Sequence, residues 1–196
     1  GKYPAQNSYV AVAAQLKTHQ VYDDAIQTYL DARKKFGEQP HFVFELSNLY
    51  GLQREYEKAA TGYLRYLEQQ PKQLGRVERE ILTLAKSKKG RPRLVKILEQ
   101  AVDKSPDSVP VQRLLAKIFL QSKNYERAFG IYKTLDELAQ AKDKSQTGRE
   151  IFSFAESARL ANALEYAEQA YRLIPDGAGK SQYQIPVLNG LGEIYK

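Results

Sequence analysis

The sequence predicts an all-α fold, a solenoid of stacked helical hairpins. Three observations predict it. An eight-residue segment with a tyrosine at each end and an alanine between them, which we call the repeating phrase, recurs at a fixed interval. Within each interval, apolar residues recur at helical spacing, and turn-forming residues separate these apolar stripes. A helical hairpin of this length cannot bury its own apolar face, so we expect neighbouring hairpins to cover one another.

The repeating phrase is the strongest of these signals. Residues 22–29 (YDDAIQTY) are followed by residues 56–63 (YEKAATGY), 34 residues later, and by residues 125–132 (YERAFGIY), a further 69 residues on. The longer interval equals one 34-residue step and one 35-residue step. The interval therefore predicts a repeat of about 34 residues, in which these tyrosines are packing residues and not ligand-binding residues.

The second repeat shows how each element is predicted. Its two apolar stripes lie on either side of a turn near Gly51, and Pro71 ends the second helix because proline cannot continue a helix. Ala59 stands where the two helices come closest, since its small side chain permits that approach. The first stripe contains Phe44, Leu46, Leu49 and Tyr50, and the second contains Ala59, Tyr63, Tyr66 and Leu67.

This pattern resembles the tetratricopeptide repeat (TPR), whose signature is W-x2-L-G-x2-Y, then A-x3-F, then P. Leu46-Ser47-x2-Tyr50, Ala59-x3-Tyr63 and Pro71 follow it, with Val43 in place of the tryptophan. The resemblance covers nearly the whole chain. It implies a right-handed superhelical solenoid whose first helices line a concave groove, and a role as a protein-interaction scaffold.

We expect repeats at about residues 6–39, 40–73, 75–108, 109–142 and 144–175, with a partial one at 185–196. The third departs from the pattern, with Leu94 and Leu98 where alanine and an aromatic residue are expected. The fifth keeps Ala163, Ala170 and the closing Pro175, with Ala167 in the aromatic place, and the sequence leaves the exact register of the third and fifth repeats open. Residues 191–195 (LGEIY) restore the signature of a first helix without its partner, and the chain starts with Gly1 instead of methionine. Both features favour an internal fragment of a longer repeat protein.

The composition limits the function classes. Cysteine is absent, which excludes disulfides, thiolate metal sites and thiol nucleophiles. The two histidines, His19 and His41, lie in no HExxH motif, and neither a GxSxG motif nor a glycine-rich phosphate loop is present. We therefore expect no catalytic residues, no bound metal and no cofactor. The composition suits the cytoplasm and the periplasm equally.

The net charge of +7 has a local origin. Residues 72–96 contain nine lysines and arginines and two glutamates, and 9 − 2 = +7 is the whole excess. The densest part, residues 86–93 (KSKKGRPR), is expected at the turn between the two helices of the third repeat. Such a loop could bind nucleic acid or an anionic surface through charge alone. Its candidate residues are Lys88, Lys89, Arg91 and Arg93.

The concave groove is the leading candidate site. Helical periodicity places certain residues of each first helix on the side away from its partner. We expect Arg79, Arg113 and Lys117 to converge there on an acidic or extended peptide segment, because charge-assisted bonds to carboxylates are favoured. A chaperone-type carboxylate clamp is disfavoured, since Phe44 stands where that clamp has lysine. The predicted groove residues are Phe44, Asn48, Arg76, Arg79, Thr83, Lys86, Arg113, Lys117 and Phe152.

Overall fold

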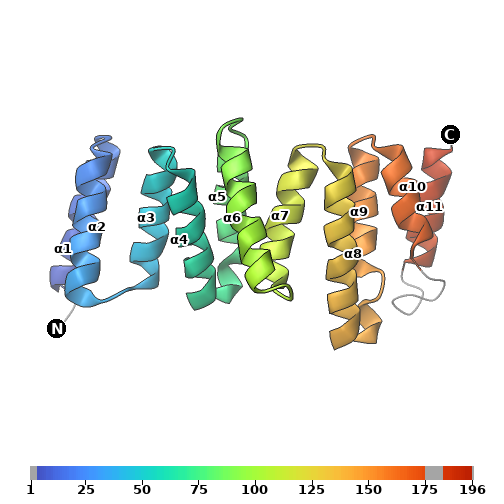
Figure 1. Cartoon of the computed structure of the whole chain (residues 1–196), viewed down its shortest axis with the longest axis horizontal. Helices are drawn as coiled ribbons and strands as arrows, with labels where there is room; N and C mark the ends of the chain where they lie inside the picture. Colours follow the sequence, from blue (N-terminus) through green and yellow to red (C-terminus); the bar gives the residue numbers. More distant parts are fainter. Residues whose placement is uncertain (1–3, 175–182, 196) are drawn as a thin grey trace. The chain divides into compact units, whose positions relative to one another are not determined.

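The computed structural model describes residues 4–174 and 183–195, and all regular structure within these ranges is helical (Figure 1). Gly1, Pro175 and Lys196, which were included in the sequence-based expectations, lie outside the described residues. The α-helices are α1 Pro4–Thr18, α2 Tyr22–Phe36, α3 Pro40–Leu52, α4 Tyr56–Gln69, α5 Leu74–Ala85, α6 Gly90–Lys104, α7 Val109–Gln121, α8 Tyr125–Lys142, α9 Arg149–Leu160, α10 Leu164–Arg172 and α11 Gln184–Ile194. Two 3₁₀ helices, η1 Pro71–Gln73 and η2 Lys144–Gln146, precede α5 and α9.

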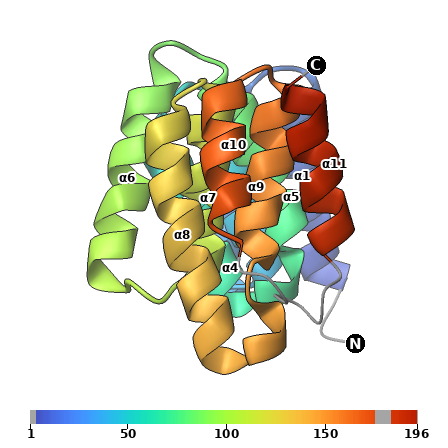
Figure 2. The same cartoon turned by 90° about the vertical axis from the view of Figure 1, so that its right-hand side faces the viewer.

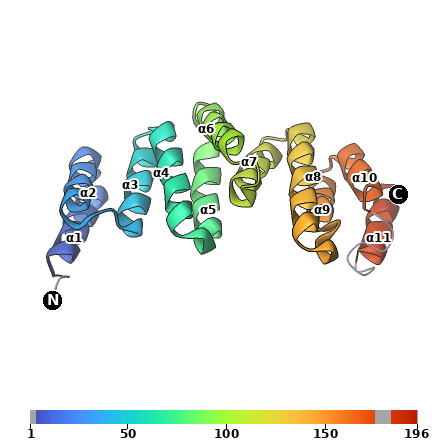
Figure 3. The ribbon, with the colours of Figure 1, turned by 60° about the horizontal axis from the view of Figure 1, so that its bottom comes forward.

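The chain forms two compact units, residues 1–100 and 101–196. In the first unit, α1 packs against α2 and α3 against α4, and α2 contacts α3. In the second unit, α7 packs against α8 and α9 against α10, and α11 lies beside α10 and α9 (Figures 2 and 3). The predicted all-α helical repeat fold is confirmed.

Small residues lie where the paired helices approach most closely. The alanines of the repeating phrase, Ala25, Ala59 and Ala128, have no exposed surface, and the same holds for Ala167 of α10. Ala167 thus takes the alanine position that the sequence pattern assigned to Ala163, which instead precedes α10 as its N-cap residue. Gly62, one turn after Ala59, contacts α3 so closely that a Cβ atom there would collide with the Ser47 hydroxyl. The approach of α4 to α3 therefore depends on small side chains on both helices.

The tyrosines of the phrase pack between helices, as the repeat predicts. Tyr29, Tyr63 and Tyr132 are buried. Tyr195, which the same pattern placed in the framework, is an exception, because 61% of its surface is exposed. The reason is that no second helix follows α11 within the described residues.

Four of the hairpin turns share one backbone signature that the sequence pattern did not reveal. A non-glycine residue with a φ near +60° ends each first helix, and the next amide donates to a carbonyl five residues earlier, as Glu55 donates to Tyr50 at 2.8 Å. This is the Schellman arrangement, which satisfies free carbonyls at a helix C-terminus. The four residues with positive φ are Gln20, Arg54, Lys123 and Asn162.

The third hairpin is built differently. Its turn spans residues 86–89 and contains no positive φ. Ser87 there bonds to the Tyr56 hydroxyl at 3.0 Å, and its hydroxyl oxygen accepts from the Gly90 amide at the start of α6. A Cβ atom at Gly90 would lie 2.7 Å from the Tyr56 ring, so glycine permits this contact. The basic residues 86–93 thus occupy the turn and the first residues of α6, as predicted.

Within residues 4–174 and 183–195, every helix is too short or too polar to span a lipid bilayer.

Candidate functional site

A tertiary cap positions the start of α9 in the second unit. Gly148 precedes the helix with a φ of +83°, a conformation that glycine adopts readily. The carboxylate of Asp136, on α8, accepts hydrogen bonds from the Gly148 amide at 2.9 Å and the Glu150 amide at 3.0 Å. A carboxylate at a helix N-terminus satisfies free amides and opposes the positive end of the helix dipole. Asp136 therefore fixes how α9 presents Arg149 and Glu150.

The first turns of α9 and the middle of α7 enclose a cavity of about 200 Å³, which we call the basic cavity. The Arg113 guanidinium lies 2.6 Å from the Glu150 carboxylate, whose side chain is only 11% exposed. Three cationic side chains and one carboxylate line the cavity, so its net charge is 3 − 1 = +2. Its lining residues are Arg113, Lys117, Tyr132, Arg149, Glu150 and Ser153.

An apolar cavity of about 290 Å³ adjoins the basic cavity, because Arg113, Arg149 and Glu150 line both. Its walls include Val109 of α7 and, from α8, Leu135, Leu138 and Ala139. The second unit thus places excess positive charge directly beside apolar surface. A ligand that combines a carboxylate with an apolar group matches both cavities.

Two of the predicted groove residues, Arg113 and Lys117, meet in the basic cavity. Arg149 and Glu150 were missed by the sequence analysis. They fall where the repeat register was least defined, and only the turn residue Gly148 marks the helix start in the sequence. Phe152 faces elsewhere: its half-buried ring packs 5.0 Å from Tyr183, measured between ring centres.

The prediction that Phe44 points away from its partner helix is wrong. Only 2% of its surface is exposed, and its ring centre lies 4.9 Å from that of Tyr66 and 5.7 Å from that of Tyr63, both on α4. The Arg76 guanidinium covers the ring at 3.7 Å from its centre. Phe44 is therefore a core residue and cannot anchor a ligand in an open groove.

The other predicted groove residues of the first unit either form hydrogen bonds within the fold or are exposed to solvent. Asn48 accepts a hydrogen bond from the Tyr63 hydroxyl at 2.6 Å, and burial, the largest cause, raises the pKa of Tyr63. The Thr83 hydroxyl donates to the Arg79 carbonyl at 2.8 Å within α5. The Arg79 side chain is exposed. Arg79 belongs to the first unit and Arg113 to the second, and their expected convergence stays a prediction.

The basic loop uses some of its charge internally. Arg91 donates to the Ala85 carbonyl at 3.0 Å, and Arg93 pairs with Glu57 at 3.5 Å. Lys86, Lys88 and Lys89 are exposed. Among the basic residues of this loop, the lysines are therefore the ones best placed to meet an anion from solvent.

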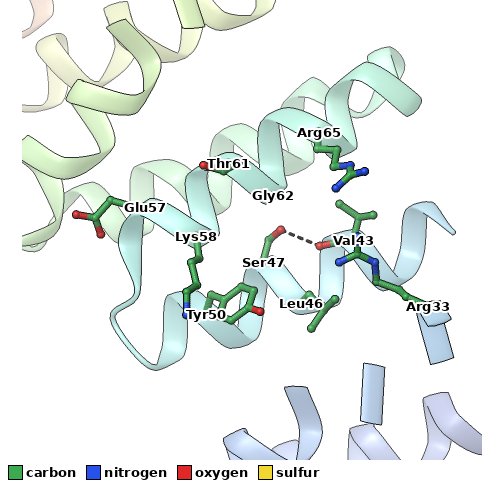
Figure 4. A pocket seen from close by; sticks show the side chains of 10 residues that line it. All are labelled: Arg33, Val43, Leu46, Ser47, Tyr50, Glu57, Lys58, Thr61, Gly62 and Arg65. Atoms are coloured by element: carbon green, nitrogen blue, oxygen red, sulfur yellow. Dashed lines mark hydrogen bonds between the residues drawn. The ribbon is translucent and has the colours of Figure 1, made fainter. Parts of the chain in front are cut away.

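A further cavity, of about 340 Å³, lies in the first unit between α3 and α4, with Arg33 of α2 at its edge (Figure 4). Val43, which stands in the tryptophan position of the repeat, lines it beside Ser47 and Gly62, so small side chains leave this space open. Arg33 and Arg65 lie on one side of it, and both pair with the carboxylate of Glu38. Each arginine here, and Lys58 as well, already has a carboxylate partner, whereas Arg149 of the basic cavity donates to the neutral Gln146 side chain, so this cavity is the weaker candidate for an anion.

No group of three or more potential metal-ligating side chains occurs within residues 4–174 and 183–195.

Comparison with known proteins identifies the repeat. Residues 11–73 match the family model described as tetratricopeptide repeat, which confirms the resemblance over the first two hairpins. No curated protein matches the chain.

Several solved structures are similar to this chain. A thermophilic TPR protein of Thermus thermophilus shares 16% identity, with 95% of this chain and 98% of that chain covered and a TM-score of 0.42. MamA of Desulfovibrio magneticus RS-1 shares 12% identity, with 93% and 99% covered and a TM-score of 0.44. PilW, a type IV pilus biogenesis factor, shares 14% identity, with 96% and 87% covered and a TM-score of 0.42.

Proposed function

Because residues 11–73 carry tetratricopeptide repeats, which generally mediate protein–protein interaction, we propose that this chain is a non-catalytic scaffold that binds an acidic, extended segment of a partner protein. The basic cavity of the second unit is the place where an acidic side chain of that segment binds. The observation that supports this proposal is the excess of two positive charges around a cavity that has a single, already paired carboxylate.

Arg149 is the residue that we expect to contact the ligand carboxylate, and Lys117 adds positive charge to the same cavity. Arg113 is held by Glu150 at 2.6 Å, so it contributes charge and shape but has a fixed partner. Arg149 is exposed and donates from one guanidinium nitrogen to the neutral Gln146 side chain. A guanidinium has five N–H donors and binds a carboxylate by two parallel hydrogen bonds.

The apolar cavity beside Arg113 and Arg149 supports a specific kind of segment. An acidic residue followed by an apolar one would place its carboxylate among the cations and its apolar side chain against Leu135 and Leu138. Burial of that apolar group adds affinity that salt does not screen. Arg79 of the first unit remains a further candidate contact for an acidic partner, since its side chain is exposed.

The alternative function is the binding of nucleic acid or an anionic surface by the basic loop. The exposed Lys86, Lys88 and Lys89 favour it, while the internal contacts of Arg91 and Arg93 reduce the charge that the loop offers. Contacts of this kind depend steeply on salt, because affinity comes mainly from counterion release.

Binding of two probes over a salt series separates the two functions. The first probe is a fluorescent peptide that alternates acidic and apolar residues, with a control peptide in which glutamine replaces every glutamate. The second is double-stranded DNA. Both are titrated by anisotropy against the wild-type chain and the loop variant Lys88→Glu/Lys89→Glu, from low salt to about 0.5 M, where interactions between exposed charges are largely screened.

The proposal predicts that the acidic peptide binds at least roughly tenfold more tightly than its glutamine control at low salt. It also predicts that binding of the acidic peptide stays measurable at about 0.5 M salt, and that the loop variant binds this peptide with the same affinity as the wild-type chain. DNA binding that exceeds peptide binding and is lost in the loop variant would replace the proposal with the alternative.

A further inference from the structure

The cavity of about 340 Å³ in the first unit, which we call the α3–α4 cavity, has an apolar interior and a charged edge. Val43 and Leu46 of α3 line its inner part and are at most 3% exposed, and the Tyr50 ring lies beside them (Figure 4). Charged side chains of the second helices α2 and α4 line the rest. The α3–α4 cavity shares no lining residue with the basic cavity.

Two small residues leave this space open. The 34-residue repeat makes Val43 the counterpart of Tyr9 in α1, and the Tyr9 ring packs edge-on against Phe36 of α2, with 5.6 Å between ring centres. An aromatic ring thus stands in the first hairpin where the second has only a valine. Gly62, which lines the cavity from α4, has no side chain to add. The same two positions hold Tyr9 and Thr28 in α1–α2, Gln112 and Ile131 in α7–α8, and Ile151 and Ala170 in α9–α10.

Two arginines at one edge of the cavity are held by their in-plane hydrogen-bond donors. The Glu38 carboxylate pairs with the guanidinium groups of Arg33 and Arg65, and it also accepts from the Gln69 amide at 3.0 Å. The N–H groups of a guanidinium lie in its plane, so these bonds leave its flat faces able to stack on an aromatic ring. A second carboxylate would have to compete with Glu38 for the same N–H groups.

A third cation lies at the other end of the cavity. The Lys58 ammonium stands over the Tyr50 ring, 5.2 Å from its centre, and Figure 4 shows this pair away from the two arginines. Positive charge therefore borders the apolar interior at both ends. The negative face of an aromatic ring is attracted to cations in this arrangement, whereas an aliphatic group gains only its burial. Among aromatic side chains, tryptophan has the strongest interaction of this kind.

We propose that the α3–α4 cavity binds a tryptophan side chain of a partner protein. Its volume lies at the lower end of the range of ligand pockets, which suits one large side chain. A buried indole N–H requires an acceptor, and the exposed Thr61 hydroxyl and Glu57 carboxylate line the cavity. A protein is the expected source of the ring, because every lining residue falls within the tetratricopeptide match at residues 11–73, and such repeats generally mediate protein–protein interaction.

The test uses the absence of tryptophan from this chain. An uncharged glycine–serine peptide with a single tryptophan is titrated with the whole chain, so that all tryptophan emission comes from the peptide. A matched peptide with leucine in place of tryptophan competes for the site. Val43→Phe fills the cavity from α3, and Arg65→Gln removes one stacking face at an exposed position. The control is Lys34→Gln, which removes an exposed cation of α2 that does not line the cavity, and circular dichroism confirms that each variant is folded.

We expect the peptide emission to move to shorter wavelength and to saturate with the wild-type chain. Lys34→Gln should bind the tryptophan peptide within about twofold of wild type, and Val43→Phe at least roughly tenfold more weakly, because its ring occupies the space. The leucine peptide should bind at least roughly fivefold more weakly than the tryptophan peptide, and Arg65→Gln should reduce this preference.

Equal affinity of the wild-type chain for the two peptides would overturn the proposal, as would a Val43→Phe or Arg65→Gln chain that matches Lys34→Gln. Displacement of the peptide by indole-3-acetate at lower concentration than by unlabelled tryptophan peptide would assign the cavity to a free aromatic anion instead. The peptides carry no acidic side chain, so failure here is distinct from failure of the proposed acidic-segment site in the second unit.

Discussion

Arg113 of α7 holds the carboxylate of Glu150 on α9 at 2.6 Å, and this pair joins two successive hairpins of the second unit. The Glu150 side chain is largely buried, so loss of its partner leaves a poorly solvated charge. We expect Arg113→Met to lower the free energy of unfolding by about 1–3 kcal/mol, measured by urea denaturation. The double variant Arg113→Met/Glu150→Met should lose less free energy of unfolding than Arg113→Met alone. If the loss in the double variant equals the sum of the losses in Arg113→Met and Glu150→Met, this role is contradicted.

Arg54 adopts a φ of +63° in the turn between α3 and α4, a conformation that costs energy for a residue with a Cβ atom. Replacement by glycine removes this cost at an exposed site. We expect Arg54→Gly to raise the free energy of unfolding by about 0.5–1 kcal/mol. Asn162 has a φ of +60° in the equivalent turn, and asparagine tolerates it better. Asn162→Gly is therefore the matched control and should gain less; a larger gain there would contradict the explanation.

Phe44 contributes to stability and not to binding. Its removal would leave a cavity among Tyr63, Tyr66 and the Arg76 guanidinium. We expect Phe44→Ala to lower the free energy of unfolding by about 3–5 kcal/mol. The affinity of the folded fraction for the acidic peptide should stay within about twofold of wild type, because the side chain is not open to a ligand. A loss of affinity at full folding would restore Phe44 as a ligand anchor.

Alkaline pH should destabilise the first unit through Tyr29. Burial, with a smaller contribution from nearby Glu45, raises the pKa of Tyr29 to about 12 from its ordinary value of 10.0. The folded state therefore holds this proton more tightly than the unfolded state. Stability is fully present below pH 10 and falls as pH rises from 10 to about 12, by about 1.4 kcal/mol per pH unit for one group.

Urea denaturation of wild type and Tyr29→Phe at about pH 8, 10 and 11.5 measures this effect. The variant lacks the titrating hydroxyl, so its stability should decline less steeply above about pH 10. Parallel declines in the two proteins would show that Tyr29 does not carry the pH dependence.

Repeat spacing predicts the fold in considerable detail. The alanines of the phrase, such as Ala25 and Ala59, are buried between paired helices because the phrase fixes which residue faces the partner. The positive φ at Gln20 and Arg54 was not predictable in the same way. Neither residue type favours that conformation, and it is set by the helix ending that the hairpin requires.

The site was only partly predictable for a physical reason. On α3 the consecutive residues Phe42, Val43 and Phe44 are all buried, because the helix is covered on more than one side. Helical periodicity then cannot tell which aromatic residue faces solvent. Arg113 was found because it lies in a well-defined first helix. Arg149 was missed because its position depends on the Asp136 cap, a tertiary contact with no local sequence pattern.

The most direct test of the central claim is a calorimetric titration of the acidic peptide into variants of the basic cavity. Lys117→Glu and Arg149→Glu reverse charge inside the cavity without leaving Glu150 unpaired, whereas Lys133→Glu reverses an exposed charge of α8 that does not line the cavity. We predict that each cavity variant binds at least roughly tenfold more weakly, and that Lys133→Glu stays within about twofold of wild type. Affinities of Lys117→Glu and Arg149→Glu equal to that of Lys133→Glu would contradict the proposed site.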